Sequence, residues 1–525
     1  MKTNKLPLII ILVIAFLIRF INIGTIPSLN PDEAALGYNA YSLLQTGKDE
    51  HGISWPLHFK SFGDYKPGGY VYLTMPFVKI LGLTPLAVRL PNLIFSVLTV
   101  FVLYRLVLLL TLDFRLSLLS AFVLAVSPWH LQFSRGAWES STALFFIVLG
   151  IYYFYKFIAT PKSFYRFIFL LPFIASLYIY HSARLISPLI VLVLFLINYK
   201  LLISLSKKLI LPCLLALIFT IPVLISFLNS GGTTRLGGIG LMADRGPLSR
   251  SEELLNHHSN VKLINRVMHN RRVLYALSWL EKYTSHFNLN FLFVNGDEVP
   301  RSKNPDMGQL YLIELPFLFI GLYSLFNSHK YSNKLKIFLI SFLLISPLAS
   351  SLTFQAPSAL RALPLVIPLS ILIALGLNTF IVWILKNGHW KLFVSCLLVI
   401  GYLFSVQYYL DSYYNHAPQR YSFAWNRGFS QIIPFIESQK NNFQNIYFTN
   451  KYDQPYILYL FYSKYDPIKI QSQIKLTPAD KFGFSTVEKI DNITFKIPGE
   501  IPSGSLVVES SDFQFTGQSF KIYTK

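Results

Sequence analysis

Charged residues are scarce in this 525-residue chain, and cysteines are rarer still. Asp, Glu, Lys and Arg together make up 14% of it, against about 25% in an average soluble domain. The two cysteines, Cys213 and Cys396, both lie inside apolar runs, so the sequence predicts neither a disulfide framework nor a cysteine metal site. The composition therefore argues against an ordinary soluble protein.

Several catalytic motifs are also missing. The sequence has no phosphate loop of Walker type, no His-Glu-x-x-His zinc helix and no Gly-x-Ser-x-Gly nucleophile elbow. ATP hydrolysis, zinc proteolysis and serine esterase chemistry therefore have no support in the sequence.

Long hydrophobic runs, by contrast, recur along most of the chain. Hydrophobic residues account for 53% of it, and the mean hydropathy is +0.47. Runs of this length predict an all-α polytopic membrane protein with about eleven transmembrane helices. The first run contains Arg19 and lacks a small-residue cleavage site, so we interpret it as a retained helix rather than a signal peptide. The predicted spans are residues 6–23, 86–110, 116–128, 140–158, 167–180, 186–197, 209–228, 310–326, 337–352, 363–385 and 392–410.

The basic residues indicate how the chain crosses the cytoplasmic membrane. Residues 411–525 hold 12 Lys and Arg against 10 Asp and Glu, so almost all of the net charge of +21 lies before them. There the basic residues gather in short loops, which marks the cytoplasmic side and does not indicate a nucleic-acid partner. We therefore expect a cytoplasmic N-terminus and two long extracytoplasmic loops, residues 25–84 and 229–309.

This pattern divides the chain into two predicted domains. Residues 1–410 form the transmembrane domain, in which residues 69–81 are too short for a span and are predicted to be re-entrant or interfacial. Residues 411–525 contain short β-rich runs separated by Pro, Gly and Asn turns. They predict a small extracytoplasmic α/β domain, for which scaffolding or acceptor binding is the default role.

Asp32 and Glu33 stand side by side just after the first span. Like charges this close favour a raised pKa in one carboxylate, which suits a general base beside the bilayer. Both residues also suit the first turn of a helix over residues 31–45, where acidic side chains complement the helix dipole. Their position alone does not decide between these readings.

Further charged residues are predicted on the same outer face. Lys66 lies between Tyr65 and a Pro-Gly-Gly bend, where it could grip a lipid phosphate or simply extend toward the membrane interface. Arg135 and Glu139 are four residues apart, a spacing that also allows a plain surface ion pair on a helix.

Cations also mark the ends of later spans. His181 and Arg184 follow one span, and Arg361 precedes another. A charge facing lipid costs about 2.5–3.5 kcal/mol at the bilayer centre and less near the interface, so a wet cavity that binds an anion is their natural place. A carboxylate base among such cations suits transfer from a lipid phosphate, because the base activates a hydroxyl and the cations stabilise the departing phosphate.

With these motifs the chain resembles the polytopic glycosyltransferases of the GT-C fold. It is most similar to the bacterial branch related to protein O-mannosyltransferases and to the aminoarabinose transferases of lipid A. The resemblance covers most of residues 1–410 and rests on the order of its motifs, which lie at residues 31–33, 65–69, 87–92, 127–139, 180–184, 293–297 and 308–311.

The resemblance implies an activity and residue roles. Family members transfer a sugar, with inversion, from a polyprenyl-phosphate donor to an acceptor on the extracytoplasmic face. Asp32 would be the general base, with Glu33 orienting substrate beside it. The residues implied to bind the donor phosphate are Lys66, Arg135 and Arg184. The other candidates for the substrate site are Tyr65, Glu139, His181 and Arg361.

The implied partners are a polyprenyl-phosphate-linked sugar, membrane lipids, and a glycan, lipid or protein acceptor. Some relatives are associated with a divalent metal ion, but no ligand set for one stands out, so no metal ligand is assigned. Two other readings stay open: a lipid-linked glycan flippase or transporter, and a polymerase or ligase of whole lipid-linked glycans. Transporters should show repeat-related broken helices with charges at mid-membrane, whereas here the charges gather at one face.

Overall fold

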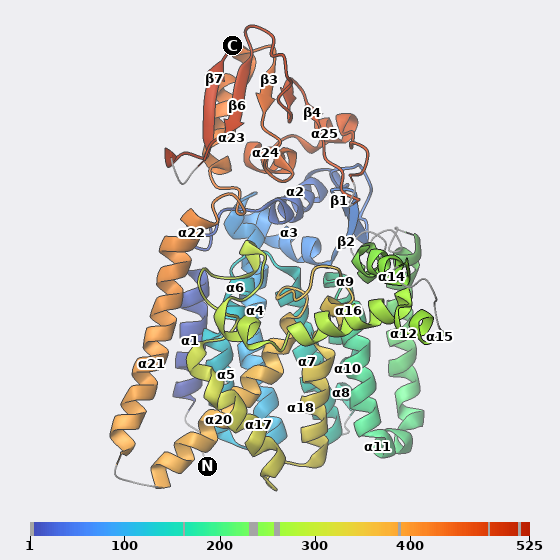
Figure 1. Ribbon diagram of the computed structural model, residues 1–525, viewed down its shortest axis with the longest axis vertical. Helices are drawn as coiled ribbons and strands as arrows, with labels where there is room; N and C mark the ends of the chain where they lie inside the picture. Colours follow the sequence, from blue (N-terminus) through green and yellow to red (C-terminus); the bar gives the residue numbers. More distant parts are fainter. Residues whose placement is uncertain are drawn as a thin grey trace.

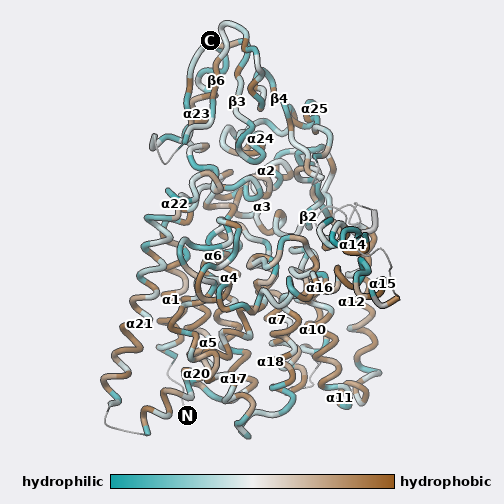
Figure 2. Tube along the Cα trace, viewed as in Figure 1, coloured by the Kyte–Doolittle hydropathy of each residue, from teal (hydrophilic) through white to brown (hydrophobic). Residues whose placement is uncertain are grey.

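A bundle of apolar helices carries a small sheet domain at one end (Figure 1). The computed structural model describes residues 5–160, 163–229, 240–256, 263–386, 390–480, 483–512 and 516–525. Hydrophobic residues dominate the bundle, whereas the sheet domain and the loops next to it are mixed in character (Figure 2). The predicted fold class, an all-α membrane protein with a C-terminal α/β domain, is therefore confirmed.

The bundle helices follow the predicted spans closely. They are α1 (Leu6–Phe20), α4 (Pro85–Thr111), α5 (Phe114–Val126), α7 (Glu139–Ala159), α8 (Ser163–Ile168), α9 (Leu170–Ile179), α10 (Ala183–Ile197), α12 (Ser206–Asn229), α17 (Leu315–Asn327), α18 (Asn333–Ile345), α20 (Val366–Lys386) and α21 (Lys391–Asp411). Among the described residues, six helices are long and apolar enough to cross a membrane, and a seventh span arises if α5 and α6 (Pro128–Ser134) form one bent span. Five apolar helices are shorter, so the number of spans stays a prediction.

Local sequence signals set where these helices begin and how closely they pack. The side chains of Thr84, Asp113 and Ser127 cap α4, α5 and α6 by accepting backbone N–H bonds. Helices α17 and α20 touch backbone to backbone, because a Cβ at Gly321 would lie 1.9 Å from the Leu372 carbonyl oxygen. Glycine at that position allows the close crossing.

The first long outer loop folds into helices and a hairpin. It contains α2 (Pro31–Thr46), β1 (His58–Ser61), β2 (Asp64–Pro67) and α3 (Gly69–Leu81). The helix expected over residues 31–45 and the apolar piece at 69–81 are both present, whereas the hairpin was not predicted. The second long loop holds η1 (Leu241–Ala243), α14 (Gly246–Asn256), α15 (Leu263–Met268), α16 (Arg271–Ser285), η2 (Asn290–Val294) and η3 (Pro300–Ser302), and part of it lies outside the described residues.

Shorter elements complete the bundle and lead out of it. They are α11 (Tyr199–Ser204), η4 (Leu312–Glu314), α19 (Leu348–Ser351), η5 (Leu363–Leu365), η6 (Ser412–His416) and α22 (Ala417–Arg420). The last two connect α21 to the sheet domain (Figure 1).

The C-terminal domain is a five-stranded sheet with the order β4-β5-β3-β6-β7. The strands are β3 (Ile446–Phe448), β4 (Lys489–Ile490), β5 (Ile493–Thr494), β6 (Leu506–Ser510) and β7 (Phe520–Thr524), and β3 pairs in parallel with β5 and β6. Its other elements are α23 (Phe429–Gln439), η7 (Lys440–Asn442), α24 (Pro455–Ser463) and α25 (Pro467–Gln473). Apolar residues of α2 and α3 share one hydrophobic core with α24 and the sheet, so the first outer loop and this domain pack as a unit.

Candidate active site

The acidic pair predicted from the sequence lies in the first turn of α2. Asn30 caps this helix: its side-chain oxygen accepts from the Glu33 N–H at 3.0 Å, and the Glu33 carboxylate accepts from the Asn30 N–H at 3.1 Å. This reciprocal capping box satisfies two backbone donors at the helix start. The helix-start reading is therefore correct for Glu33.

Glu33 also forms a buried ion pair with Arg89 of α4. Nε and Nη2 of Arg89 each donate to the carboxylate at 2.7 Å, and the Ala137 N–H donates to it at 2.7 Å as well. The Glu33 side chain is only 1% exposed. With every oxygen engaged, Glu33 positions α2 and has no capacity left to orient a substrate directly.

The same arginine fixes the segment that leads into α2. Nη1 of Arg89 donates to the carbonyls of Ile23 and Pro27 at 2.7 and 2.8 Å, and Nη2 donates to that of Ser28 at 3.1 Å. One guanidinium thus joins α4, the turn after α1 and the start of α2, which holds the neighbouring Asp32 in place.

Asp32 points away from this buried pair. Successive side chains on an α-helix diverge by about 100°, so two adjacent carboxylates need not share one environment. Asp32 is 38% exposed and pairs with Lys66 of β2. Each acid therefore has its own cation, and the like-charge conflict expected between them is offset.

A tight hairpin carries Lys66. Phe62 and Gly63 make its two-residue turn with φ values of +57° and +84°. At the base, a Cβ on Gly69 would lie 2.6 Å from the Tyr178 carbonyl oxygen, so glycine lets the bend dock against the end of α9. The Pro-Gly-Gly segment after Lys66 joins the end of β2 to the start of α3.

Acidic groups surround the Lys66 ammonium. Burial opposes its charge, but Asp32, Glu139 and Asp64 outweigh burial, so the pKa of Lys66 lies above its usual value. Lys66 therefore stays cationic at all physiological pH values. Glu139, in the first turn of α7, belongs to this cluster because its negative charge helps to raise the pKa of Lys66.

The turn between α9 and α10 brings the predicted His181 and Arg184 against the same hairpin. His181 Nε2 lies 3.0 Å from the Tyr65 carbonyl oxygen, and the Arg184 guanidinium donates to His58 of β1. Burial, then the charge of Arg184, lowers the pKa of His58 to about 4, so His58 is neutral and accepts this bond at neutral pH.

Arg135 occupies a different place from the predicted one. Its two terminal nitrogens donate to the carbonyls of Ile18, Arg19, Ile21 and Ile26 at 2.6 to 3.2 Å. Its guanidinium carbon lies 4.9 Å from the ring centroids of both Tyr413 and Tyr414. All four terminal N–H groups are used at the end of α1, so a donor-phosphate role does not fit this geometry.

Arg361 likewise belongs to another group of residues. It donates to the Gln355 carbonyl at 3.3 Å and exerts its charge on Asp297. Asp297 accepts from the N–H groups of Val299 and Ala359 at 2.8 and 2.6 Å, which ties the second outer loop to the segment before α20.

Two residues of the cluster were missed in the sequence. Burial, then the charge of Asp32, raises the pKa of Asp453, while Arg301 and Lys66 oppose the shift. Asp453 belongs to the C-terminal domain and Arg301 to the second long loop. Charges from segments far apart in the sequence therefore act on one another around Lys66. No local signal marks either residue, because only the packing of the C-terminal domain brings them here.

The described residues do not form a divalent-ion site. Across the described ranges, no group of three or more His, Cys, Asp and Glu side chains converges as metal ligands. The carboxylates of Asp32 and Glu139 interact electrostatically with the ammonium group of Lys66, which is their positively charged neighbour.

Removing Arg89 should destabilise the protein strongly. In Arg89→Met, Glu33 would be left buried without its cation, a change that typically costs about 3–5 kcal/mol. We expect a clear fall in melting temperature of the purified protein in detergent, and partial recovery in Glu33→Gln/Arg89→Met. Arg420→Met is the matched control, since Arg420 pairs with Asp306 on the surface and its loss should leave melting unchanged. Equal melting of the two single variants would contradict this role.

Glu50, in the loop after α2, should make stability depend on pH. It is fully buried, its Oε2 has no partner among the described residues, and burial raises its pKa to about 8. In the unfolded chain Glu50 ionises near pH 4.5, whereas in the folded protein it keeps its proton up to a pH of about 8. The free energy of unfolding therefore falls as the pH rises from 4.5 through 8. The melting advantage of Glu50→Gln over the wild type should therefore grow between pH 5 and pH 9. A constant difference, like that expected for the exposed Glu488→Gln, would refute it.

Residues 9–229 match the family described as "Dolichyl-phosphate-mannose-protein mannosyltransferase". This range includes α2, the hairpin and the α9–α10 turn, and therefore both Asp32 and Lys66. No curated protein sequence matches the chain.

Two solved structures share its fold at low sequence identity. ArnT from Cupriavidus metallidurans, bound to undecaprenyl phosphate, is 12% identical with a TM-score of 0.54, over 98% of this chain and 94% of ArnT. The oligosaccharyltransferase of Archaeoglobus fulgidus, in complex with zinc and sulfate, is 14% identical with a TM-score of 0.52. The match covers 87% of this chain and 61% of that longer one. The chain shares the GT-C fold of these structures, and its residues 9–229 are similar to the mannosyltransferase family.

Proposed function

We propose that the protein transfers a sugar, with inversion, from a polyprenyl-phosphate donor to a hydroxyl of an acceptor on the extracytoplasmic face of the membrane. The observation that carries this proposal is the pair of Asp32 and Lys66, a carboxylate and a half-buried cation held together where the bundle meets its long loops. The undecaprenyl phosphate bound by ArnT, which has the same fold, supports a lipid phosphate as the donor carrier.

Lys66 would exchange partners when the donor binds. Its ammonium group pairs with Asp32 in the free protein, and a donor phosphate entering beside it offers a second anionic partner. As Lys66 turns to the phosphate, an acceptor hydroxyl can donate a hydrogen bond to Asp32 in place of the ammonium group. One cation thus couples donor binding to the release of the base.

The chemical step then follows from these positions. Asp32 takes the proton of the acceptor hydroxyl as its oxygen attacks the anomeric carbon, and the bond from that carbon to the phosphate oxygen breaks. The polyprenyl phosphate leaves with the bonding electrons, and Lys66 stabilises its charge. Attack opposite the leaving group inverts the anomeric centre.

Arg184 is proposed as a second cation for the leaving phosphate. Neutral His58 accepts a hydrogen bond from one N–H group of Arg184, and the Leu177 carbonyl accepts from another at 3.2 Å. The guanidinium is therefore oriented beside the hairpin that carries Lys66. His181 holds the backbone of Tyr65, one residue before Lys66, and so acts through the position of the hairpin.

The arrangement of the chain supports the proposed orientation. The N-terminus and the C-terminal domain lie at opposite ends of the bundle (Figure 1). Lys330 pairs with Asp113 at 2.7 Å, which joins the loops after α4 and α17. Such short basic loops favour the cytoplasmic side, so the cluster at the other end would face outward.

Asp32→Asn should lower turnover by roughly 10²–10⁴-fold, because the amide cannot accept the hydroxyl proton. The measurement is released lipid phosphate when the purified enzyme is incubated with a panel of polyprenyl-phosphate sugars and acceptors. Lys66→Met should also lower the apparent affinity for the donor.

The control is Asp306→Asn, which changes an exposed carboxylate outside the cluster and should keep full activity. Near-normal turnover in Asp32→Asn, with the control behaving the same way, would rule out Asp32 as the base.

A further inference from the structure

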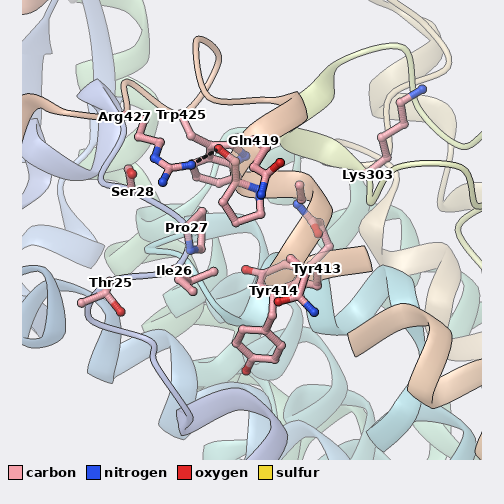
Figure 3. Close-up of a pocket in the computed structure, with 14 residues that line it drawn as sticks. Thr25, Ile26, Pro27, Ser28, Lys303, Tyr413, Tyr414, Gln419, Trp425 and Arg427 are labelled. Carbon is pink, nitrogen blue, oxygen red and sulfur yellow. Dashed lines mark hydrogen bonds between the residues drawn. The ribbon is translucent and has the colours of Figure 1, made fainter. Parts of the chain in front are cut away.

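A hollow of about 290 Å³ with a mixed polar and apolar wall lies where the bundle meets the C-terminal domain. Its wall comes from the turn after α1 (residues 25–28), α6, the second long loop and the segment 413–427 (Figure 3). None of the residues assigned above to the Asp32–Lys66 cluster lines it. The hollow is therefore separate from the reacting groups.

Amide and aromatic side chains make up much of the wall. They are Gln132, Asn415, Gln419, Tyr413, Tyr414 and Trp425. Amides both donate and accept hydrogen bonds, as sugar hydroxyls require, and the half-buried ring of Tyr414 offers apolar surface to the C–H side of a sugar ring. This combination suits a saccharide.

Gln132 gives an independent sign of a ligand. Its side chain is 4% exposed, and its Nε2 donates to the Arg301 carbonyl at 2.9 Å. Its Oε1 is buried and has no hydrogen-bond partner among the described residues. Buried amide oxygens are rarely left unsatisfied, so a donor such as a ligand hydroxyl is expected there.

The charge of the wall is positive. Arg427 and Lys303 line the hollow, and no acidic residue does among those that the structure describes. Arg427 is oriented by the Pro418 carbonyl, to which it donates at 3.0 Å (Figure 3). A second hollow of about 640 Å³ shares Ser28 and Arg427 with the first, and its described wall is also free of acids. An anionic group on the ligand would be favoured beside Arg427.

The hollow adjoins the start of α2 through its own wall. Ser28 lines the hollow four residues before Asp32, and its carbonyl accepts from Arg89, the same guanidinium that binds Glu33. A ligand in the hollow would therefore lie near the start of α2, the helix turn that carries Asp32.

We propose that this hollow binds an acidic saccharide unit of the acceptor, with its carboxylate or phosphate at Arg427 and its hydroxyls at the amides. The inference rests on the proposed function, because it names the class of acceptor for that reaction. A peptide is less well suited, since none of the described residues that line the first hollow lies in a strand that could pair with it.

Binding can be tested apart from transfer. Full-length Asp32→Asn protein, which should not turn over, is titrated by calorimetry with trigalacturonic acid and its neutral methyl ester. The same protein is titrated with phosphorylated maltotriose and with maltotriose, and with a hexaglutamate peptide. We expect one acidic saccharide or both to bind at least about tenfold more tightly than the neutral counterpart, and the pair that responds identifies carboxylate or phosphate.

Variants assign the preference to the hollow. Arg427→Gln should abolish the difference between acidic and neutral saccharides, Arg427→Lys should keep much of it, and the exposed Lys469→Gln is the matched control that should change nothing. Equal binding of acidic and neutral saccharides, an unchanged preference in Arg427→Gln, or equally tight binding of hexaglutamate would overturn the inference.

The two proposals fail separately. Transfer that survives Asp32→Asn would refute the catalytic assignment while leaving Arg427-dependent binding in place. Loss of transfer in Asp32→Asn without any charge-dependent binding would refute only the acceptor site.

Discussion

The buried ion pair of Glu33 and Arg89 is the contact on which the geometry of the site depends. Two charges removed from water are tolerated only when their hydrogen bonds are complete, and here the carboxylate and the guanidinium are bonded on all sides. The pair ties α4 to the start of α2, to the turn after α1 and to the loop before α7. Because Glu33 is immobilised, the side chain of the preceding residue, Asp32, is held in a fixed direction away from the buried pair.

The C-terminal domain is part of this arrangement rather than an appendage. It shares a hydrophobic core with α2 and α3, and the Ser485 N–H donates to the Phe62 carbonyl at 2.8 Å, which holds the tip of the hairpin that carries Lys66. Asp453 reaches the same cluster electrostatically. Scaffolding or acceptor binding was the default role expected for this domain, and its contacts with the hairpin agree with scaffolding.

The sequence predicted the helices, because long apolar runs report membrane crossing directly. It also predicted that Asp32, Lys66, His181 and Arg184 share one face, and all four lie at or against the same hairpin. It could not assign Glu33 and Arg135, whose roles depend on partners far along the chain. Arg135 binds carbonyls at the end of α1, and such main-chain partners leave no trace in residue types. Asp453 and Arg301 escaped for the same reason, since only tertiary packing brings them to Lys66.

Lys66 pairs with Asp32 in the free protein, and the proposed mechanism requires this pair to break when the donor binds. A cryo-EM structure of the full-length protein with a polyprenyl phosphate bound tests this most directly. The account predicts that the Lys66 ammonium leaves Asp32 and binds the phosphate, while the Glu33–Arg89 pair stays in place. A bound phosphate that lies away from Lys66, with the Lys66–Asp32 pair intact, would contradict it.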